Sequence, residues 1–287
     1  MTPQVLATDL DGTLIPLDGN AQNADDLPRI REQLTLAQME LIFVTGRHLA
    51  SILAVMDRAQ LPPPGWIIGD VGTSIYRRMT PGSAWAEASP MSSATPVTAS
   101  TDEYQLVDEY AEHLRSILGD FGVAQLAQQL RPIDGLRPQE AEKQSQFKLS
   151  YYVQHDVIGD VADRVAGHLA DASAPYTMVA SRDPFTGDGL IDLLPKRVTK
   201  AYAMNWWASK NSIDRRAILY AGDSGNDAAV FAAGYRSIIV ANADATVLAA
   251  AHAAHARSGW TDRIFAAPAP ATSGVLSGLR HYTVRGN

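Results

Sequence analysis

Residues 5–14 read Val-Leu-Ala-Thr-Asp-Leu-Asp-Gly-Thr-Leu, a short apolar run that gives way to two carboxylates, Asp9 and Asp11, and a glycine turn. In an open α/β sheet the carboxyl ends of the strands face the ligand crevice, so acids at the end of a first strand lie where a substrate and a metal bind. A surface turn rich in Asp and Gly is the plainer alternative. The stretch predicts the first strand of an α/β sheet and, at its end, a candidate reaction site.

Short apolar runs alternate with helical stretches in the first and last thirds of the chain. In the first segment we expect strands at residues 5–8, 41–44 and 66–69 and helices at residues 27–39 and 48–59. The pattern resumes with helices at 200–209 and 227–233, strands at 218–221 and 237–241, and a surface helix at 249–256. Strands that alternate with helices favour a parallel, doubly wound, Rossmann-like sheet of the α/β class.

The pattern changes between these two segments. Residues 80–100 are rich in Ser, Thr, Ala and Pro, which is typical of a connection between domains. We then expect a helix capped by Ser100 or Thr101, with one apolar face made of Leu106, Tyr110, Leu114 and Ile117. Strands at 147–153, 176–180 and 190–194 and a helix at 158–169 follow. We therefore predict an α+β cap domain, residues 83–194, inserted into a core made of residues 1–82 and 195–287.

The composition narrows the class of protein. The 287 residues carry 31 acidic and 24 basic side chains, with no basic block that would follow a phosphate backbone, so we expect no nucleic-acid partner. No stretch approaches the roughly 20 apolar residues of a membrane span and the N-terminus has no signal-peptide pattern, so we expect a cytoplasmic protein without a membrane partner. With no cysteine and no zinc-type histidine pattern, we expect a hard cation such as Mg²⁺.

Two further segments carry groups that suit a phosphate. The apolar run 42–44 leads into Thr45-Gly46-Arg47, where a hydroxyl and free backbone N–H groups at a strand end suit a phosphate oxyanion, although a Thr cap with a Gly turn is the alternative. Lys200 follows another expected strand and could balance the charge of the acid pair. Lys196 and Arg197 lie in the same stretch, and spacing alone does not choose among the three cations.

The last cluster is Gly222-Asp223-Ser224-Gly225-Asn226-Asp227, directly after the expected strand 218–221. Two carboxylates and an amide on a glycine-permitted turn form an oxygen-rich set that suits a hard cation, and the spacing of the acids does not match an EF-hand loop. The cluster therefore predicts a metal site at the end of a second core strand.

Together these groups favour phosphoryl transfer. A carboxylate can attack phosphorus and form an aspartyl-phosphate when a cation and positive groups neutralise the repulsion between the two anions. Asp9 is the natural nucleophile. Asp11, two positions along, could protonate the leaving oxygen and then activate a water molecule.

The motifs resemble those of the haloacid dehalogenase (HAD) superfamily of Mg²⁺-dependent phosphatases; the matching segments are Asp9 to Thr13, Thr45, Lys200 and Gly222 to Asp227. The resemblance implies that Asp9 is the nucleophile and a metal ligand and that Asp11 is the acid/base and ligates through its carbonyl.

The same resemblance implies that Thr45, Gly46 and Lys200 bind phosphate. It also implies that Asp223 ligates Mg²⁺, with Asp227 as a further ligand and Asn226 as a supporting contact to the phosphate.

Within that superfamily the chain is similar to sucrose-phosphate phosphatase. Four strings carry the likeness: residues 68–76, 147–153, 192–195 and 222–227. The resemblance implies sucrose 6-phosphate as the substrate, with mannosylfructose phosphate and glucosylglycerol phosphate as alternatives. We expect the cap to contact the sugar, with Lys148 as one contact; an ordinary exposed lysine is the alternative there.

Three other functions share parts of this pattern. A response-regulator receiver also forms an aspartyl-phosphate, but receivers are about half this length and lack a cap and a D-x-D-G-T string. A degenerate domain that only binds a sugar phosphate is disfavoured by the retained acids and Lys200. A sugar phosphomutase, which recaptures the phosphate on a bound sugar, is the enzymatic alternative. The sequence leaves both a monomer and a dimer open.

Overall fold

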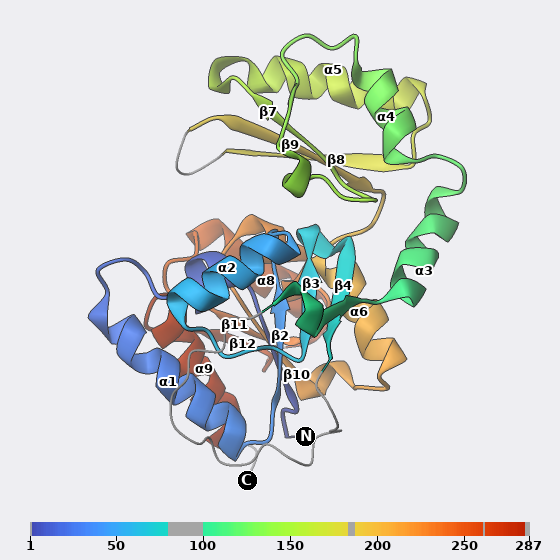
Figure 1. Cartoon of the computed structure of the whole chain (residues 1–287). Helices are drawn as coiled ribbons and strands as arrows, with labels where there is room; N and C mark the ends of the chain where they lie inside the picture. The colour runs from blue at the N-terminus through green and yellow to red at the C-terminus, as the bar shows by residue number, and fades with distance from the viewer. Residues whose placement is uncertain (1, 80–99, 183–186, 261, 285–287) are drawn as a thin grey trace. The chain divides into compact units, whose positions relative to one another are not determined.

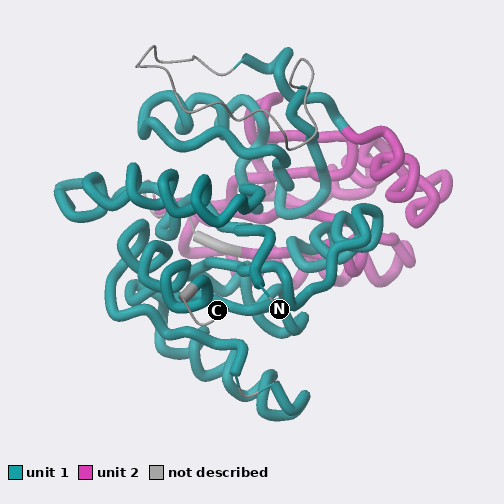
Figure 2. Tube along the Cα trace, turned by 90° about the horizontal axis from the view of Figure 1, so that it is seen from below, with its two compact units in different colours: residues 1–106, 199–287 teal, residues 107–198 magenta. Residues whose placement is uncertain are grey.

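The computed structural model describes residues 2–79, 100–182, 187–260 and 262–284 (Figure 1). Contacts divide the chain into two compact units: Met1–Leu106 with Thr199–Asn287, and Val107–Val198 (Figure 2). The expected boundary between residues 82 and 83 lies outside the described residues, as does most of the Ser/Thr/Ala/Pro-rich connection. The expected boundary between residues 194 and 195 lies just before the observed one.

The first unit is built on a single twisted sheet with the strand order β12-β11-β10-β1-β2-β3-β4-β5. Its strands are β1 (Val5–Thr8), β2 (Glu40–Val44), β3 (Trp66–Gly69), β4 (Ser74–Arg78), β5 (Tyr104–Leu106), β10 (Ile218–Gly222), β11 (Arg236–Ile239) and β12 (Ile264–Ala266). The run from β12 to β3 is parallel, which confirms the predicted α/β fold class. β4 and β5 add an antiparallel edge that the sequence did not predict.

Helices cover this sheet, as Figure 1 shows. They are α1 (Ala21–Leu36), α2 (Leu49–Ala59), α6 (Lys200–Lys210), α7 (Ala228–Phe231), α8 (Ala245–Arg257) and α9 (Ala271–Val284). Short turns η1 (Leu10–Leu14), η2 (Asp70–Gly72), η3 (Thr101–Glu103), η6 (Arg215–Ala217) and η7 (Gly225–Asp227) join them to the strands. One hydrophobic cluster joins α1, α2 and α9 to the strands through fully buried residues such as Leu6, Ile30, Phe43 and Leu279.

The first helix differs from the prediction at both ends. It begins at Ala21 because the side chain of Asn20 accepts a hydrogen bond from the N–H of Asn23, and it continues through Pro28. Proline removes one hydrogen bond from a helix interior, which is why the sequence pattern places the start later. The helix ends at Leu36 because Gln38 adopts a left-handed backbone with φ of 51°.

The helix expected from Ser100 or Thr101 is wrong at its start. Ser100 caps only the short turn η3, and residues 104–106 then pair with β4 as strand β5. The helix itself, α3, is Asp108–Leu118. Leu106 therefore belongs to a strand and Ile117 is 37% exposed, whereas Tyr110 and Leu114 are buried as expected.

The expected helix at 249–256 is the longer α8, and it is not a plain surface helix. His255 is buried, with its Nε2 atom 2.6 Å from the carbonyl oxygen of Phe231 and its ring edge-on to Trp260. The aromatic packing of this side chain depends on residues distant in sequence, so the Ala/His composition does not reveal it.

The second unit is an α+β fold, as predicted. Its strands β6 (Arg137–Pro138), β7 (Leu149–Val153), β8 (Tyr176–Arg182) and β9 (Gly189–Pro195) form an antiparallel sheet of order β6-β7-β9-β8. Its helices are α3, α4 (Val123–Leu130) and α5 (Ile158–Asp171), with turns η4 (Ala141–Lys143) and η5 (His155–Val157). The buried alternate residues Tyr151, Val153, Ile191 and Leu193 form one apolar face of the sheet.

In the part of the chain that the structure describes, no helix is both long and apolar enough to cross a membrane.

Candidate active site

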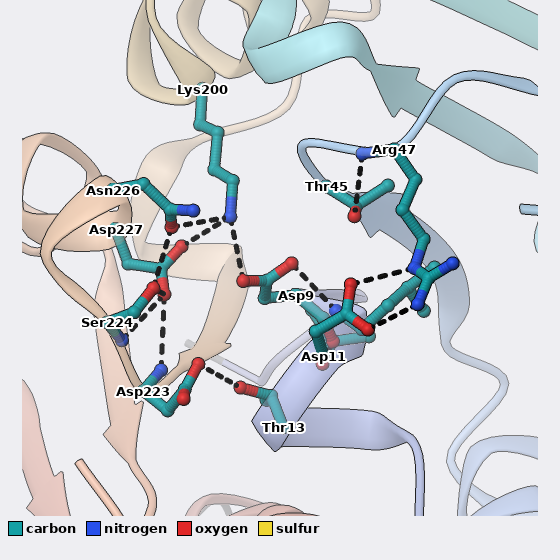
Figure 3. Close-up of polar contacts among 12 residues, drawn as sticks. Asp9, Asp11, Thr13, Thr45, Arg47, Lys200, Asp223, Ser224, Asn226 and Asp227 are labelled. Carbon is teal, nitrogen blue, oxygen red and sulfur yellow. Dashed lines mark hydrogen bonds and ion pairs between the residues drawn. The ribbon is translucent and has the colours of Figure 1, made fainter. Parts of the chain in front are cut away.

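The candidate site lies at the carboxyl ends of three adjacent parallel strands (Figure 3). Asp9 follows β1, the middle strand of the three. Thr45 follows β2 on one side of β1, and Asp223 follows β10 on the other side. Lys200 begins α6 and reaches the same place. Segments as far as 210 residues apart in the sequence therefore meet at one end of the sheet.

Asp9 is buried at the centre of the site, with 4% of its surface exposed. Its Oδ1 accepts a hydrogen bond from the N–H of Leu10 at 2.8 Å, and its Oδ2 lies 2.8 Å from Nζ of Lys200. Burial raises the pKa of the Asp9 carboxyl, and the ammonium of Lys200 opposes that rise. The carboxylate is thus fixed in orientation by one donor and one cation.

Lys200 is fully buried among acceptors. Its Nζ lies 2.8 Å from Asp9, 2.7 Å from Asp227 and 2.9 Å from Oδ1 of Asn226. Burial alone would lower the pKa of this lysine, but the two carboxylates outweigh it and raise the pKa to about 12. Lys196 and Arg197 are exposed, so the geometry selects Lys200 from the three cations that the sequence left open.

Asp227 has both carboxylate oxygens engaged. Oδ1 accepts from Lys200 and from the hydroxyl of Tyr220, and Oδ2 accepts from the backbone N–H groups of Asp223 and Ser224, each at 3.1 Å, and from the Ser224 hydroxyl. A carboxylate with this many donors is fixed in position and orientation. Asp227 thereby orients Lys200 and shapes the turn that carries Asp223.

Tyr220 was missed by the sequence analysis. It is a fully buried residue of β10, and in the sequence it reads as one more apolar strand residue. Its position two residues before the Gly222-Asp223 turn is the only sequence signal that a hydroxyl could reach the acid cluster.

Asp223 is less buried than Asp9 and points toward the first motif (Figure 3). Its Oδ1 accepts a hydrogen bond from the Thr13 hydroxyl at 3.1 Å. Burial, together with the neighbouring charge of Asp227, raises the pKa of Asp223 to about 6. A Cβ on Gly12 would lie 2.3 Å from Oδ2 of Asp223, and Gly12 has a φ of +68°, so both space and backbone require glycine there.

Asn242 is a second residue that the sequence analysis missed. Its Nδ2 donates to the carbonyl of Gly12 at 2.8 Å, and its Oδ1 accepts from the N–H of Ala271 at 2.8 Å. The side chain ties the first motif to the start of α9. No local pattern in the sequence marks it, because both partners are distant along the chain.

The acid cluster has the composition of a cation site. Among the described residues, Asp9, Asp223 and Asp227 each offer a carboxylate oxygen within 4.8 Å of the others. Lys200 contacts two of these three carboxylates, so one ammonium faces three anions and negative charge is left over. Oxygen donors with excess negative charge fit a hard divalent cation. Each oxygen of Asp227 accepts from at least two donors, more than the oxygens of Asp9 or Asp223 do, so Asp9 and Asp223 are the carboxylates with room for the cation.

Asp11 does not join that cluster through its side chain, which is 56% exposed. Arg47 donates two hydrogen bonds to the Asp11 carboxylate, from Nε at 2.7 Å and from Nη2 at 2.6 Å. Nη1 of the same guanidinium donates to the Ser51 hydroxyl at 2.7 Å. The sequence pattern predicts no role for Arg47. The pairing depends on the close approach of the loops that follow β1 and β2, which spacing does not show.

Thr45, which follows β2, lies on one side of Asp9, and Asn226 lies on the other side (Figure 3). Thr45 is buried, and its hydroxyl accepts a hydrogen bond from the N–H of Arg47 at 3.2 Å. Thr45 and Gly46, the residues of this tripeptide expected to bind phosphate, therefore follow the strand next to the one that carries Asp9.

Lys148 belongs to the second unit, directly before β7. It is 5% exposed, so the alternative of an ordinary exposed lysine is wrong. Nearby, the hydroxyl of Ser150 donates to Asp192 across the β7–β9 pair, and Gln144 accepts from the N–H of Ser150 at 2.8 Å. This face of the sheet is polar, in contrast to the apolar face that packs on α5.

The chain is similar to several known proteins. The family model of sucrose-6F-phosphate phosphohydrolase matches residues 2–91 and 91–283. Mannosylfructose-phosphate phosphatase of Agrobacterium fabrum is 27% identical over 281 residues, which are 97% of this chain and 96% of that protein. A protein of Nitrosococcus oceani named as a HAD-like hydrolase is 30% identical over 244 residues, 85% of this chain, and the match spans 60% of that relative's length.

Among solved structures, the sucrose-phosphatase from Synechocystis sp. PCC6803, determined in complex with sucrose and phosphate, superposes with a TM-score of 0.69 and 22% sequence identity. The match covers 98% of each chain. At this identity the likeness concerns the fold, including both the α/β and the α+β parts.

Proposed function

The chain belongs to the sucrose-6F-phosphate phosphohydrolase family of the HAD superfamily, and from that premise we propose that it hydrolyses the phosphate ester of a sugar phosphate and releases inorganic phosphate. The observation that carries the proposal is the buried carboxylate of Asp9 at the carboxyl end of β1, which contacts Lys200 and lies beside Asp223 and Asp227 at the carboxyl end of β10. A carboxylate fixed next to a cation and a phosphate-binding loop suits nucleophilic attack on phosphorus.

In the proposed first step, a carboxylate oxygen of Asp9 attacks the phosphorus atom and the bond between phosphorus and the sugar oxygen breaks. Asp11 donates a proton to that leaving oxygen. Lys200, the Thr45 hydroxyl and the N–H of Gly46 bind the phosphoryl oxygens and balance their charge.

In the second step, Asp11 accepts a proton from a water molecule, whose oxygen attacks the phosphorus of the aspartyl-phosphate. The bond between phosphorus and Asp9 breaks, which releases inorganic phosphate and restores the carboxylate. Asp227 binds no substrate in this scheme; it keeps Lys200 and the Asp223 turn in place.

Mg²⁺ fits this donor set, with Asp9, Asp223 and the carbonyl of Asp11 as its proposed ligands. When bound, it supplies positive charge that lowers the repulsion between the Asp9 carboxylate and the phosphate. Removing divalent cations with a chelator is expected to abolish phosphate release, and added Mg²⁺ is expected to restore it.

We propose sucrose 6-phosphate as the substrate, because the family model that matches nearly the whole chain is that of the sucrose-phosphate enzyme. Mannosylfructose phosphate is the second candidate, favoured by the full-length similarity to a mannosylfructose-phosphate phosphatase. The polar face of the second unit, with Lys148, Ser150 and Asp192, is proposed to contact the sugar.

The test is a phosphate-release assay with Mg²⁺ over sucrose 6-phosphate, mannosylfructose phosphate, glucosylglycerol phosphate and simple hexose phosphates. Asp9→Asn is expected to lower kcat by about 1,000-fold or more. Asp57→Asn, an exposed acid on α2, is the matched control and should retain full activity. Normal turnover by Asp9→Asn would contradict the nucleophile assignment, and transfer of phosphate to another sugar position without release would indicate a mutase.

A further inference from the structure

The turn after β3 has an unusual backbone. Asp70, Val71 and Gly72 have φ values of +49°, +59° and +97°, three successive residues in the left-handed region. Glycine adopts this region freely, but a β-branched residue such as valine does so rarely and at a cost in free energy. Strain of this kind persists where the surrounding structure imposes it, and it concentrates at functional sites.

The left-handed turn binds the phosphate-binding tripeptide through the main chain. The N–H of Asp70 donates to the carbonyl of Arg47 at 2.9 Å, and the N–H of Val71 donates to the carbonyl of Thr45 at 3.1 Å. The carbonyl groups of Thr45 and Arg47, the two residues that flank Gly46, are thereby fixed. Because the C=O and N–H of a trans peptide point in opposite directions, fixing the Thr45 carbonyl points the N–H of Gly46 away from the turn.

The same turn contacts the N-terminus of α6, the helix that begins with Lys200. A Cβ on Gly72 would lie 2.4 Å from the carbonyl oxygen of Thr199, the residue that caps α6 immediately before Lys200. On the other side, Cγ2 of Val71 lies 3.8 Å from the position that a Cβ on Gly46 would occupy. One short turn therefore touches both the Thr45-Gly46 loop and the start of the Lys200 helix.

We propose that the left-handed turn Asp70–Gly72 positions the phosphate-binding groups, and that Val71 is the positioning residue through its side chain, which packs over Gly46. A β-branched side chain has few rotamers and so presents a fixed surface to the Thr45-Gly46 loop, whereas glycine at position 71 would leave that space empty and let the turn adopt more backbone conformations. The inference deepens the proposed function and rests on it for the identity of the substrate, but not for the binding of phosphate.

The test compares wild type with Val71→Gly, Val71→Ile and Gln38→Gly. Gln38 is left-handed, with φ of 51°, in the loop between α1 and β2, so its glycine variant is the matched control for relief of backbone strain. The measurements are the melting temperature, the Kd of inorganic phosphate by calorimetry in the presence of Mg²⁺, and kcat and KM on the best sugar phosphate.

Val71→Gly is expected to melt no lower than wild type, because glycine removes the left-handed strain. Its Kd for phosphate and its KM are expected to rise about tenfold with kcat changed less than about threefold, the pattern of a loss in uniform binding. Val71→Ile and Gln38→Gly should keep both constants within about twofold of wild type.

An unchanged phosphate Kd in Val71→Gly overturns the inference, as does a wild-type protein that binds no phosphate. A wild-type protein that binds phosphate but hydrolyses no sugar phosphate contradicts the proposed function. In that case the phosphate Kd values of wild type and Val71→Gly still decide whether Val71 positions the phosphate-binding groups.

Discussion

At the scale of single residues, the pair of Arg47 and Asp11 links the first two motifs. The two contacts from one guanidinium fix both the position and the plane of the Asp11 carboxylate. A lysine would keep the charge but can make only a point contact. Since the proposed role of Asp11 is to pass a proton in a fixed direction, its orientation matters to the rate.

We therefore expect Arg47→Lys to lower kcat by roughly 10- to 100-fold on the best substrate, at an unchanged melting temperature. Arg58→Lys, at an exposed position of α2, is the control and should behave as wild type. The measurements are steady-state kinetics and thermal unfolding. If Arg47→Lys had the wild-type kcat, the orientation of Asp11 would not depend on the pair.

Glu40, at the start of β2, gives a prediction on stability against pH. Burial raises the pKa of its carboxyl above 4.5, although the N–H groups of Gly65 and Leu41 oppose the rise. The folded state thus holds this proton more tightly than the unfolded chain does. The stability from Glu40 is complete below the unfolded pKa and is lost as the pH rises through the folded pKa.

Glu40→Gln carries no charge at any pH, so it should melt higher than wild type at pH 7.5, by about 2 °C. The difference should close as the pH falls below about 4, where the wild-type carboxyl is protonated in both states. Melting curves at several pH values provide the measurement. Glu32→Gln, at an exposed position of α1, is the control. An equal shift at both ends of the pH range would show that the charge is not the cause.

Some residues of the candidate site are recognisable from the sequence around them, and others are not. Asp9 and Asp227 stand within recognisable strings at or near the ends of strands. Lys200 was one of three cations that spacing left open, and it lies within hydrogen-bonding distance of Asp9 and Asp227. Tyr220 and Asn242 act through partners that only the folded chain brings near, so their residue types carry no local signal.

At the scale of elements, the N-terminus of α6 places Lys200. Thr199 caps this helix by accepting a hydrogen bond from the N–H of Tyr202 at 3.2 Å. Asp244 caps α8 in the same unit by accepting from the N–H of Thr246 at 2.8 Å. The two caps are of the same kind, but only Thr199 directly precedes a residue proposed to bind phosphate.

Thr199→Ala and Asp244→Ala are each expected to cost about 1 kcal/mol of stability. Only Thr199→Ala should also raise KM, by a few fold, because the first turn of α6 carries Lys200. Urea unfolding and kinetics on both variants separate the two effects. A similar KM change in Asp244→Ala would mean that the loss of stability alone, rather than the position of α6, affects activity.

The elements that the sequence predicted are those with strong periodicity or long apolar runs. The central strands β1, β2, β3 and β10 are nearly continuous apolar segments, which is typical of a parallel sheet buried on both faces. The three-residue strands β5 and β12 are too short to show a period, and their pairing depends on neighbours already in place. The helix expected from Ser100 failed for that reason.

At the scale of the whole molecule, the first unit needs both ends of the chain. β1 pairs with β2 on one side and with β10 on the other, so the acid cluster assembles only when residues from either side of the insertion share a sheet. The second unit has its own sheet and its own apolar face, with Val161 and Val165 of α5 fully buried. Each unit therefore has the packing of a separate domain.

This organisation predicts that catalysis and sugar preference separate when residues 107–198 are replaced by a flexible glycine/serine linker. Leu106 ends β5 and Thr199 caps α6, both within the first unit, so every strand of its sheet is retained. The shortened protein should fold, as circular dichroism and thermal melting would reveal. It should hydrolyse p-nitrophenyl phosphate within about tenfold of wild type, because the proposed catalytic residues all belong to that unit.

Its preference among sugar phosphates, measured as ratios of kcat/KM, should fall toward one, because binding energy from the non-reacting part of the substrate is lost. Asp9→Asn in the shortened protein is the control against contaminating phosphatase. A shortened protein that kept the wild-type ratios would assign the sugar contacts to the first unit. Substitution of Asp192 by Asn in the full chain then offers a finer check, since the amide oxygen can still accept the hydrogen bond from Ser150 and only the negative charge of Asp192 is removed.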